Sequence, residues 1–123
     1  VTKGINMFQM DSINVPVLGL VENMSYFTPE ELPNKKYFLF GKEGVKQLAQ
    51  QMKLDLLGEI PIVQSIRESG DAGRPAILQN NSLVSESFIY LSNNVIAAIK
   101  RRNEKHPKTK KVDITHKKGC SNN

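Results

Sequence analysis

The sequence predicts an α/β fold built on a parallel sheet. Patterns typical of helices and strands follow one another along the 123 residues in the order helix, strand, helix, strand, helix, helix, which is an α/β order. The first strand-like run, residues 15–21, is apolar throughout rather than alternating, as expected for a strand covered on both faces of a parallel sheet. Two strands form a small sheet for this much helix, so we expect the chain to be a piece of a longer protein that supplies more strands.

The first part of the chain predicts a helix and a strand. Val1, Ile5 and Phe8 lie at helical spacing, which indicates the end of a helix over roughly the first ten residues. Turn-forming residues follow at 11–14. The apolar run 15–21, rich in β-branched residues, then predicts the first strand.

A second helix and a second strand follow after a long connection. Apolar residues at i, i+3, i+4 and i+7 predict an amphipathic helix, and they are Val45, Leu48, Ala49 and Met52. The run 54–60 predicts the second strand. Pro61 is expected to be the first residue of the next helix, because its φ is already set for that position, with Gly70 near the C-terminal cap.

A long helix is predicted from Leu83 to about Arg102, on the 4-3-4 spacing of apolar residues. These residues are Val84, Phe88, Leu91, Val95 and Ile99. Few large apolar residues follow, so residues 106–123 are expected to form a basic, disordered tail. Residues 1–105 are expected to form the folded domain part.

The positive charge of the chain is concentrated at its C-terminal end. The net charge is +5, but the residues from Lys100 onward carry nine basic and two acidic side chains, and the rest of the chain is slightly acidic. The sequence therefore disfavours a nucleic-acid interface on the folded body. No apolar run approaches the roughly 18 residues of a membrane span, which disfavours a membrane partner. A single cysteine is compatible with the reducing cytosol, so we expect a cytoplasmic location.

Two segments at strand ends are candidate ligand contacts, because ligands of open parallel sheets gather beyond the carboxyl ends of the strands. The amide of Asn23 can both donate and accept a hydrogen bond, which suits the edge of a purine base. Gly58 and Pro61 fix the backbone at the second strand end. The alternative is that Asn23 only caps a turn and Pro61 only starts a helix.

Other kinds of site find no support in the sequence. The segment 41–44 has glycines and a lysine but lacks the spacing of a phosphate-binding loop, so it is expected to open a helix. His106, His116 and Cys120 all lie in the predicted tail without metal-ligand spacing. We therefore predict no catalytic residue and no metal ligand in this chain.

Aromatic residues bracket the long connection. They are Tyr26, Phe27, Tyr37, Phe38 and Phe40. Either they pin the connection to the body, or they form a contact surface for a second subunit or a client protein. The sequence leaves both interpretations open.

Four blocks of the chain resemble, in order and spacing, the C-terminal half of the Mrp/ApbC family. They are KGINMF, VPVLGLVENMSYF, FGKEGVKQLA and LLGEIPIVQSIRESGDAGRPA. The resemblance covers residues 1–78 closely and the following helix to about residue 102 loosely, and it does not extend to the tail. Members of this family are P-loop ATPases related to MinD and to the nitrogenase iron protein, and they carry iron–sulfur clusters to apo-proteins.

The resemblance implies the C-terminal portion of a doubly wound, mostly parallel P-loop NTPase sheet, in a parent that works as a homodimer with Mg-ATP at its interface. The parent would be an ATPase, and this chain alone would be inactive because the family's Walker A loop lies upstream of residue 1. Asn23 matches the family's strand-end asparagine that contacts adenine. Pro61, Ile62 and Val63 match the segment that packs beside the base.

The chain departs from the family pattern in the connection. Many members follow ENMSYF with a C-x-x-C pair that holds a bridging iron–sulfur cluster, whereas residues 28–36 here contain no cysteine. Since thiolates are the usual cluster ligands, this segment cannot bind a cluster in that way. Either a cluster is held elsewhere, for instance by Cys120, or this branch of the family has no cluster role. A positioning ATPase like MinD or ParA, or a non-catalytic interaction module with a basic tail, is the alternative to cluster transfer to apo-proteins.

Overall fold

The computed structural model describes residues 1–29, 31–32, 34–78 and 82–108. The predicted tail, with His116 and Cys120, therefore lies almost wholly outside the described residues. The elements along the chain are α1 (Thr2–Gln9), β1 (Gly19–Phe27), α2 (Gly44–Met52), β2 (Asp55–Ile62), α3 (Gln64–Asp71), the 3₁₀ turn η1 (Ala76–Leu78) and α4 (Ser82–Lys105). The α/β class predicted from the sequence is confirmed.

The chain divides into two compact units, the first made of Val1–Val17 with Pro107–Asn123 and the second of Leu18–His106. In the first unit, α1 ends at Gln9, and the Val15 N–H donates to the Phe8 carbonyl across the following turn at 2.9 Å. All other helices and both strands belong to the second unit, which contains every candidate site residue predicted above.

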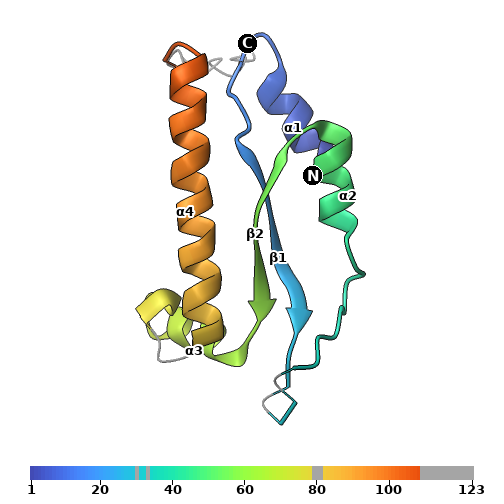
Figure 1. Ribbon diagram of the computed structural model, residues 1–123, viewed down its shortest axis with the longest axis vertical. Coiled ribbons are helices and arrows are strands. Elements are labelled where there is room, and N and C mark those ends of the chain that lie inside the picture. The colour runs from blue at the N-terminus through green and yellow to red at the C-terminus, as the bar shows by residue number, and fades with distance from the viewer. Residues whose placement is uncertain (30, 33, 79–81, 109–123) are drawn as a thin grey trace, which may run out of the picture. The chain divides into compact units, whose positions relative to one another are not determined.

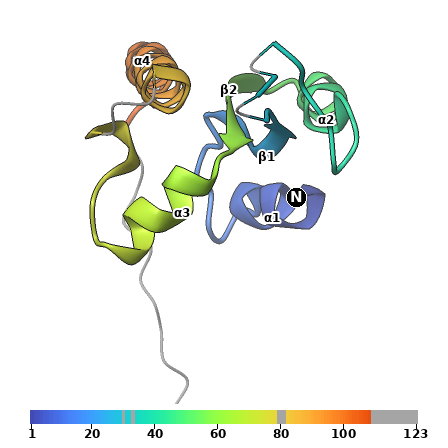
Figure 2. The ribbon, with the colours of Figure 1, turned by 90° about the horizontal axis from the view of Figure 1, so that it is seen from below.

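The second unit is built on two parallel strands, β1 and β2, connected through α2. In two views at right angles the strands lie between α2 and α4 (Figures 1 and 2). The α4 side of β2 is close-packed: a Cβ built on Gly58 would lie 3.2 Å from the Cβ of Leu91. The Asn94 amide also donates to the Leu57 carbonyl at 2.8 Å, which joins α4 to β2 by a hydrogen bond.

Both strands differ from their predicted bounds. β1 begins at Gly19 rather than at residue 15, and it continues through the polar residues of the ENMS segment to Phe27. β2 contains Pro61 and Ile62, so the prediction that Pro61 starts a helix is wrong, and α3 begins at Gln64. A proline is tolerated within a strand where its missing N–H faces an open edge of the sheet. In a sheet of two strands, each strand has one open edge.

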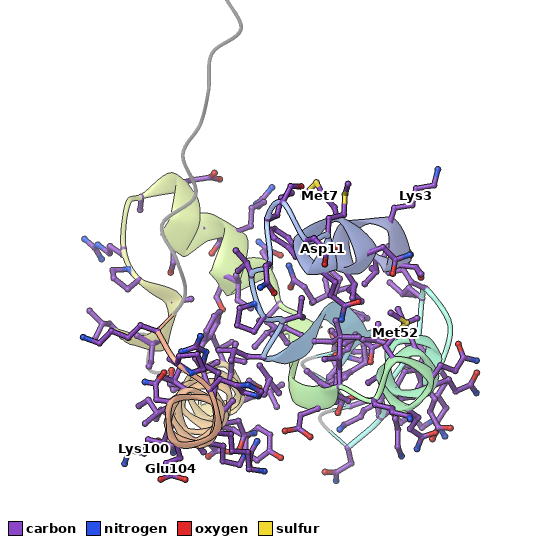
Figure 3. The ribbon with its side chains drawn as sticks, turned by 90° about the horizontal axis from the view of Figure 1, so that it is seen from above. Lys3, Met7, Asp11, Met52, Lys100 and Glu104 are labelled. Atoms are coloured by element: carbon purple, nitrogen blue, oxygen red, sulfur yellow. The ribbon has the colours of Figure 1, made fainter. Side chains whose placement is uncertain are left out.

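The two predicted amphipathic helices are confirmed. In α2, Ala49 is buried, and the helix is capped after Met52 by Lys53, whose left-handed conformation closes the turn. In α4, Val84 is fully buried and Ala98 is buried, whereas Ile99, the last member of the predicted apolar row, is exposed. Figure 3 shows Lys100 and Glu104 on the side of α4 that points away from the strands.

Candidate nucleotide-base site

The carboxyl ends of β1 and β2 lie at the same end of the second unit, next to the start of α3 (Figure 1). Asn23 on β1 pairs in register with Ile60 on β2, the residue before Pro61. The two strands are also linked there by the buried Ser25, whose hydroxyl donates to the Ile60 carbonyl at 3.2 Å. The structure therefore brings Asn23 beside the Ile60–Pro61 segment, although the two are far apart in sequence.

An irregularity in β1 follows directly after Asn23. The chain advances four residues from Asn23 to Phe27 while β2 advances two, from Ile60 to Ile62. Met24 takes up part of this difference in a left-handed conformation, with φ of 57°. Backbone irregularities of this kind are common beside binding sites, where they redirect a side chain.

Asn23 is exposed, and its side chain is held by the strand irregularity. Its Oδ1 accepts a hydrogen bond from the Met24 N–H at 2.9 Å. Together with the left-handed conformation of Met24, this bond fixes the orientation of the Asn23 amide. An exposed, oriented amide at a strand end is suited to pair with the edge of a base.

The other three predicted base contacts are placed differently from one another. Pro61 is buried in β2, and Ile62 pairs with Phe27 across the sheet. Val63 is half-buried and precedes the first turn of α3 in an extended conformation. The segment thus runs from beside Asn23 out to the start of α3, and Ile62 and Val63 are only partly covered.

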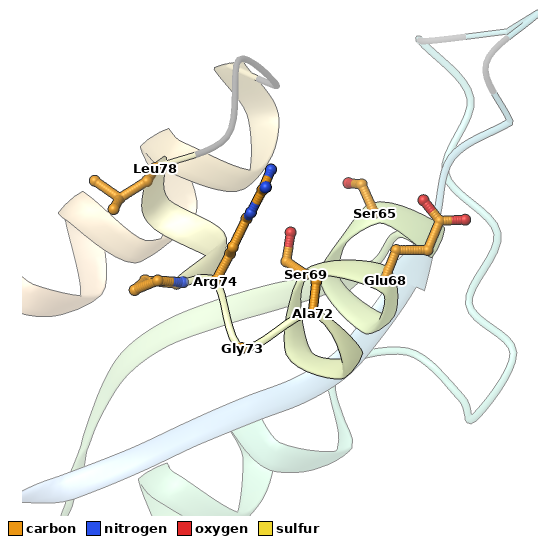
Figure 4. Close-up of a pocket in the computed structure, with 8 residues that line it drawn as sticks. Ser65, Glu68, Ser69, Ala72, Gly73, Arg74 and Leu78 are labelled. Atoms are coloured by element: carbon orange, nitrogen blue, oxygen red, sulfur yellow. The ribbon is translucent and has the colours of Figure 1, made fainter.

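A groove of about 540 Å³ lies beside α3, and the sequence analysis missed it. It is lined by Ser65, Glu68, Ser69, Ala72, Gly73, Arg74, Pro75 and Leu78. Figure 4 shows the side chains of Ser65 and Ser69 on α3 and the side chain of Arg74 extending from the next turn. The spacing of the two serines, four residues apart on one helix, was the available sequence signal.

Two carboxylates face each other one residue before Asn23. Glu22 and Glu59 are register partners on the neighbouring strands. The pKa of Glu22 is raised, first by partial burial, then by the charge of Glu59 and by a hydrogen bond with it. Like charges opposite each other on a sheet are destabilising. The Glu22–Glu59 pair therefore makes the stability of the sheet next to Asn23 depend on pH.

Replacing Glu22 by glutamine is expected to raise the free energy of unfolding at about pH 7 by roughly 0.2–1 kcal/mol, the range for cross-strand pairs. The raised pKa means that the folded state binds the Glu22 proton more tightly than the unfolded state does. The contribution of this carboxyl to stability therefore falls as the pH rises from its ordinary pKa of 4.5 through the raised value. The variant should lack this fall in urea denaturation across that window.

Asp55→Asn is the matched control, because Asp55 is also a carboxylate of this strand pair but pairs with Arg101 at 2.5 Å. Its neutralisation removes an attraction, so the control should lose a little stability. An identical pH dependence in wild type and Glu22→Gln would contradict the carboxylate pair.

The connection after β1 is closed at its base by backbone hydrogen bonds and by ring contacts. Phe27 and Tyr37 exchange two backbone hydrogen bonds, of 2.9 and 2.8 Å. The Lys36 ammonium lies 4.2 Å from the centroid of the Tyr26 ring, and the Phe38 ring packs at 6.3 Å from the same ring. Tyr26 is 6% exposed, whereas Phe40 is 75% exposed. Tyr26 therefore holds the connection against the body, which is the first of the two interpretations that the sequence left open. Phe40 is exposed and does not hold it there.

No group of three or more histidine, cysteine, aspartate or glutamate side chains gathers into a metal site anywhere in the described ranges. Within the same ranges, no helix is long and apolar enough to cross a membrane. The residues at the strand ends thus offer an oriented amide and partly covered aliphatic side chains, which fit a base better than a phosphate or a metal ion.

Comparison with known proteins decides the family. A sequence model of the ParA group, described as a NUBPL iron-transfer P-loop NTPase, matches residues 1–96. The chain belongs to this family. The resemblance inferred from the four sequence blocks is thereby confirmed.

Curated relatives of this family are named for iron–sulfur proteins. The chain is 41% identical over 117 residues to the Arabidopsis thaliana "Iron-sulfur protein required for NADH dehydrogenase, mitochondrial", covering 93% of this chain and 36% of the relative. It is 39% identical over 99 residues to mouse "Iron-sulfur cluster transfer protein NUBPL", covering 80% of this chain and 30% of the relative. The chain therefore spans about a third of the length of these relatives.

A solved structure supports the fold. The nucleotide-binding protein of Archaeoglobus fulgidus, determined in complex with ADP, matches with a TM-score of 0.52 at 34% identity, over 59% of this chain and 29% of that one. The parallel strand pair and its helices are thus the C-terminal portion of a P-loop NTPase fold.

Proposed function

We propose that this chain is the base-binding, C-terminal part of an ATP-dependent protein that assembles iron–sulfur clusters or transfers them to apo-proteins. Family membership and the names of the relatives, which refer to iron–sulfur proteins, support this role. The structural observation that carries it is the register that sets Asn23 beside Ile60 and Pro61 at the carboxyl ends of two parallel strands.

In this proposal Asn23 recognises the edge of adenine, and Pro61, Ile62 and Val63 pack beside the ring. The oriented amide of Asn23 and the partial exposure of Ile62 and Val63 support these roles. The sequence has no phosphate-binding loop, so the phosphates and Mg²⁺ would be held by other parts of the parent. The parent would then be the ATPase, and this chain alone would bind nucleotide poorly.

Replacing Asn23 by alanine in the full-length protein is expected to weaken ATP binding by about 1–3 kcal/mol, the effect of one or two lost hydrogen bonds to a buried base. Isothermal titration calorimetry would measure the change. Asn93→Ala is the matched control, because Asn93 is an exposed asparagine of α4 that lies outside the site. An unchanged affinity in Asn23→Ala, with ATP still bound, would remove Asn23 from the base site.

An iron–sulfur cluster would be cargo of the parent rather than a ligand of the connection after β1. Residues 28–36 contain no cysteine, and the connection is already closed by the Phe27–Tyr37 pair. Cys120, the single thiol, is the remaining candidate ligand of this chain. Iron and sulfide analysis after anaerobic reconstitution of the parent, with and without Cys120→Ser, would test where the cargo is held.

The partners and location of the parent follow from the same proposal. Its partners would be apo-proteins that receive clusters, and the parent would act as a homodimer. The cytoplasmic location predicted from the sequence competes with an organellar one, because the Arabidopsis relative is named as mitochondrial. Cell fractionation with an antibody to the protein would distinguish the two.

A further inference from the structure

The register of the two strands is interrupted inside the proposed base site. Asn23 pairs with Ile60, and the next pair along the sheet is Phe27 with Ile62. Between these pairs β1 has three residues, 24–26, whereas β2 has only Pro61. An inserted stretch of this kind disrupts the regular pairing of the two backbones. The position of Asn23 relative to Pro61 therefore depends on what else links the strands there.

Ser25 supplies such a link from within the interrupted stretch. Its hydroxyl donates to the Ile60 carbonyl at 3.2 Å. Ser25 is 4% exposed and Ile60 is 5% exposed, so water does not reach this bond to replace it, and its loss is costly. Both residues are already buried by this chain, and the further parts of a longer protein can only bury them more.

The same hydroxyl lies next to the turn that orients Asn23. Met24, between Asn23 and Ser25, has a left-handed φ of 57°, and its N–H donates to the Asn23 Oδ1 at 2.9 Å. A residue with a side chain keeps this conformation only where its surroundings hold it. Asn23 pairs with Ile60 before the turn, and Ser25 bonds to Ile60 after it. Ile60 therefore fixes both ends of the turn at Met24.

We propose that Ser25 is a positioning residue of the base site, whose hydroxyl holds the Met24 turn against Ile60 and so keeps the Asn23 amide oriented for the base. This role rests on the proposed function, because it needs Asn23 to contact a base. Ser25 is too buried to contact the nucleotide itself. Without its hydroxyl the turn relaxes, and the Asn23 amide must be ordered again when the base binds, which lowers the affinity. The phosphates, held by other parts of the parent, are unaffected.

Isothermal titration calorimetry of the full-length protein, with ATP and separately with inorganic triphosphate, tests this role. Ser25→Ala is expected to weaken ATP binding by about tenfold, the effect of one lost hydrogen bond to a buried acceptor, and to leave triphosphate binding unchanged. Asn94→Ala is the matched control, because the Asn94 amide donates to another β2 carbonyl, that of Leu57, at 2.8 Å. The control should lower the urea midpoint but leave both affinities at their wild-type values.

A double-mutant cycle with Asn23→Ala separates positioning from a general effect on the fold. Once the Asn23 amide is absent there is nothing left to orient, so adding Ser25→Ala should weaken ATP binding by less than about twofold. Circular dichroism would check that each variant keeps its secondary structure. Ser25→Cys keeps the size of the side chain and a weak donor, and it carries the same test if Ser25→Ala does not fold.

The outcomes distinguish this role from the proposed function. If Asn23→Ala leaves ATP binding unchanged, the base site falls and the role of Ser25 falls with it. If Asn23→Ala weakens ATP binding but Ser25→Ala does not, only the role of Ser25 is overturned. It is likewise overturned alone if Ser25→Ala weakens ATP and triphosphate binding equally, or if its effect is the same with and without the Asn23 amide.

Discussion

Replacing Gly19 by alanine is expected to lower the free energy of unfolding by about 1–3 kcal/mol, the cost of overpacking a close contact. A Cβ at this position would lie 2.6 Å from the Asp55 carbonyl oxygen and 2.6 Å from the Cγ of Leu57. The carbonyl belongs to the backbone of β2 at the residue that pairs with Gly19. This carbonyl cannot move away without loosening the Gly19–Asp55 pair at the start of the sheet. The strain therefore cannot be relieved by a small local shift.

Urea denaturation of the two proteins side by side would measure this loss. Gly70→Ala is the matched control, because a Cβ at Gly70 meets nothing within 4 Å and the residue lies inside α3. That variant should gain about 0.5–1 kcal/mol, since alanine loses less conformational entropy than glycine in a helix. A Gly19→Ala protein as stable as wild type would mean that the strands do not approach so closely at their start.

The sequence was sufficient to predict the helices α2 and α4, because both have a complete amphipathic repeat. It was not sufficient for the strand bounds. The prediction treated a buried strand as a continuous apolar run, whereas half of β1 is the polar ENMS segment, held in the sheet by pairs with Glu59 and Ile60. Those pairs are contacts with a distant segment, which the local pattern of either strand does not contain.

The position of Asn23 near Pro61 could be predicted, because the carboxyl ends of neighbouring parallel strands meet at one edge of a sheet. The Glu22–Glu59 pair could not. It depends on the exact register, and a shift of one residue would set Glu59 opposite Asn23 or Val21 instead. The groove beside α3 was also missed, because it needs the turn at Gly73, whose left-handed conformation brings Arg74 back toward the helix.

Replacing Tyr26 by alanine is expected to have the largest effect of the substitutions considered, a loss of about 3–5 kcal/mol in the free energy of unfolding. The ring is buried, and it carries contacts from both Lys36 and Phe38, on the far side of the connection. Its removal leaves a cavity beneath the connection and also removes the surface on which these two side chains rest. The effect should therefore be local as well as global, with the connection opening before the body unfolds.

Two measurements separate these effects. Urea denaturation gives the global loss, and limited trypsin cleavage after Lys35 and Lys36 reports opening of the connection, which should be much faster in Tyr26→Ala. Lys36→Gln removes only the contact between the ammonium and the ring, so it should cost about 0.5–1 kcal/mol. Tyr26→Phe keeps the ring and should keep the connection closed. If Tyr26→Ala loses stability but is cleaved at these sites no faster than wild type, the Phe27–Tyr37 backbone pair alone closes the connection. Faster cleavage would instead mean that an aromatic ring holds this connection, which contains no cysteine at residues 28–36, against the body.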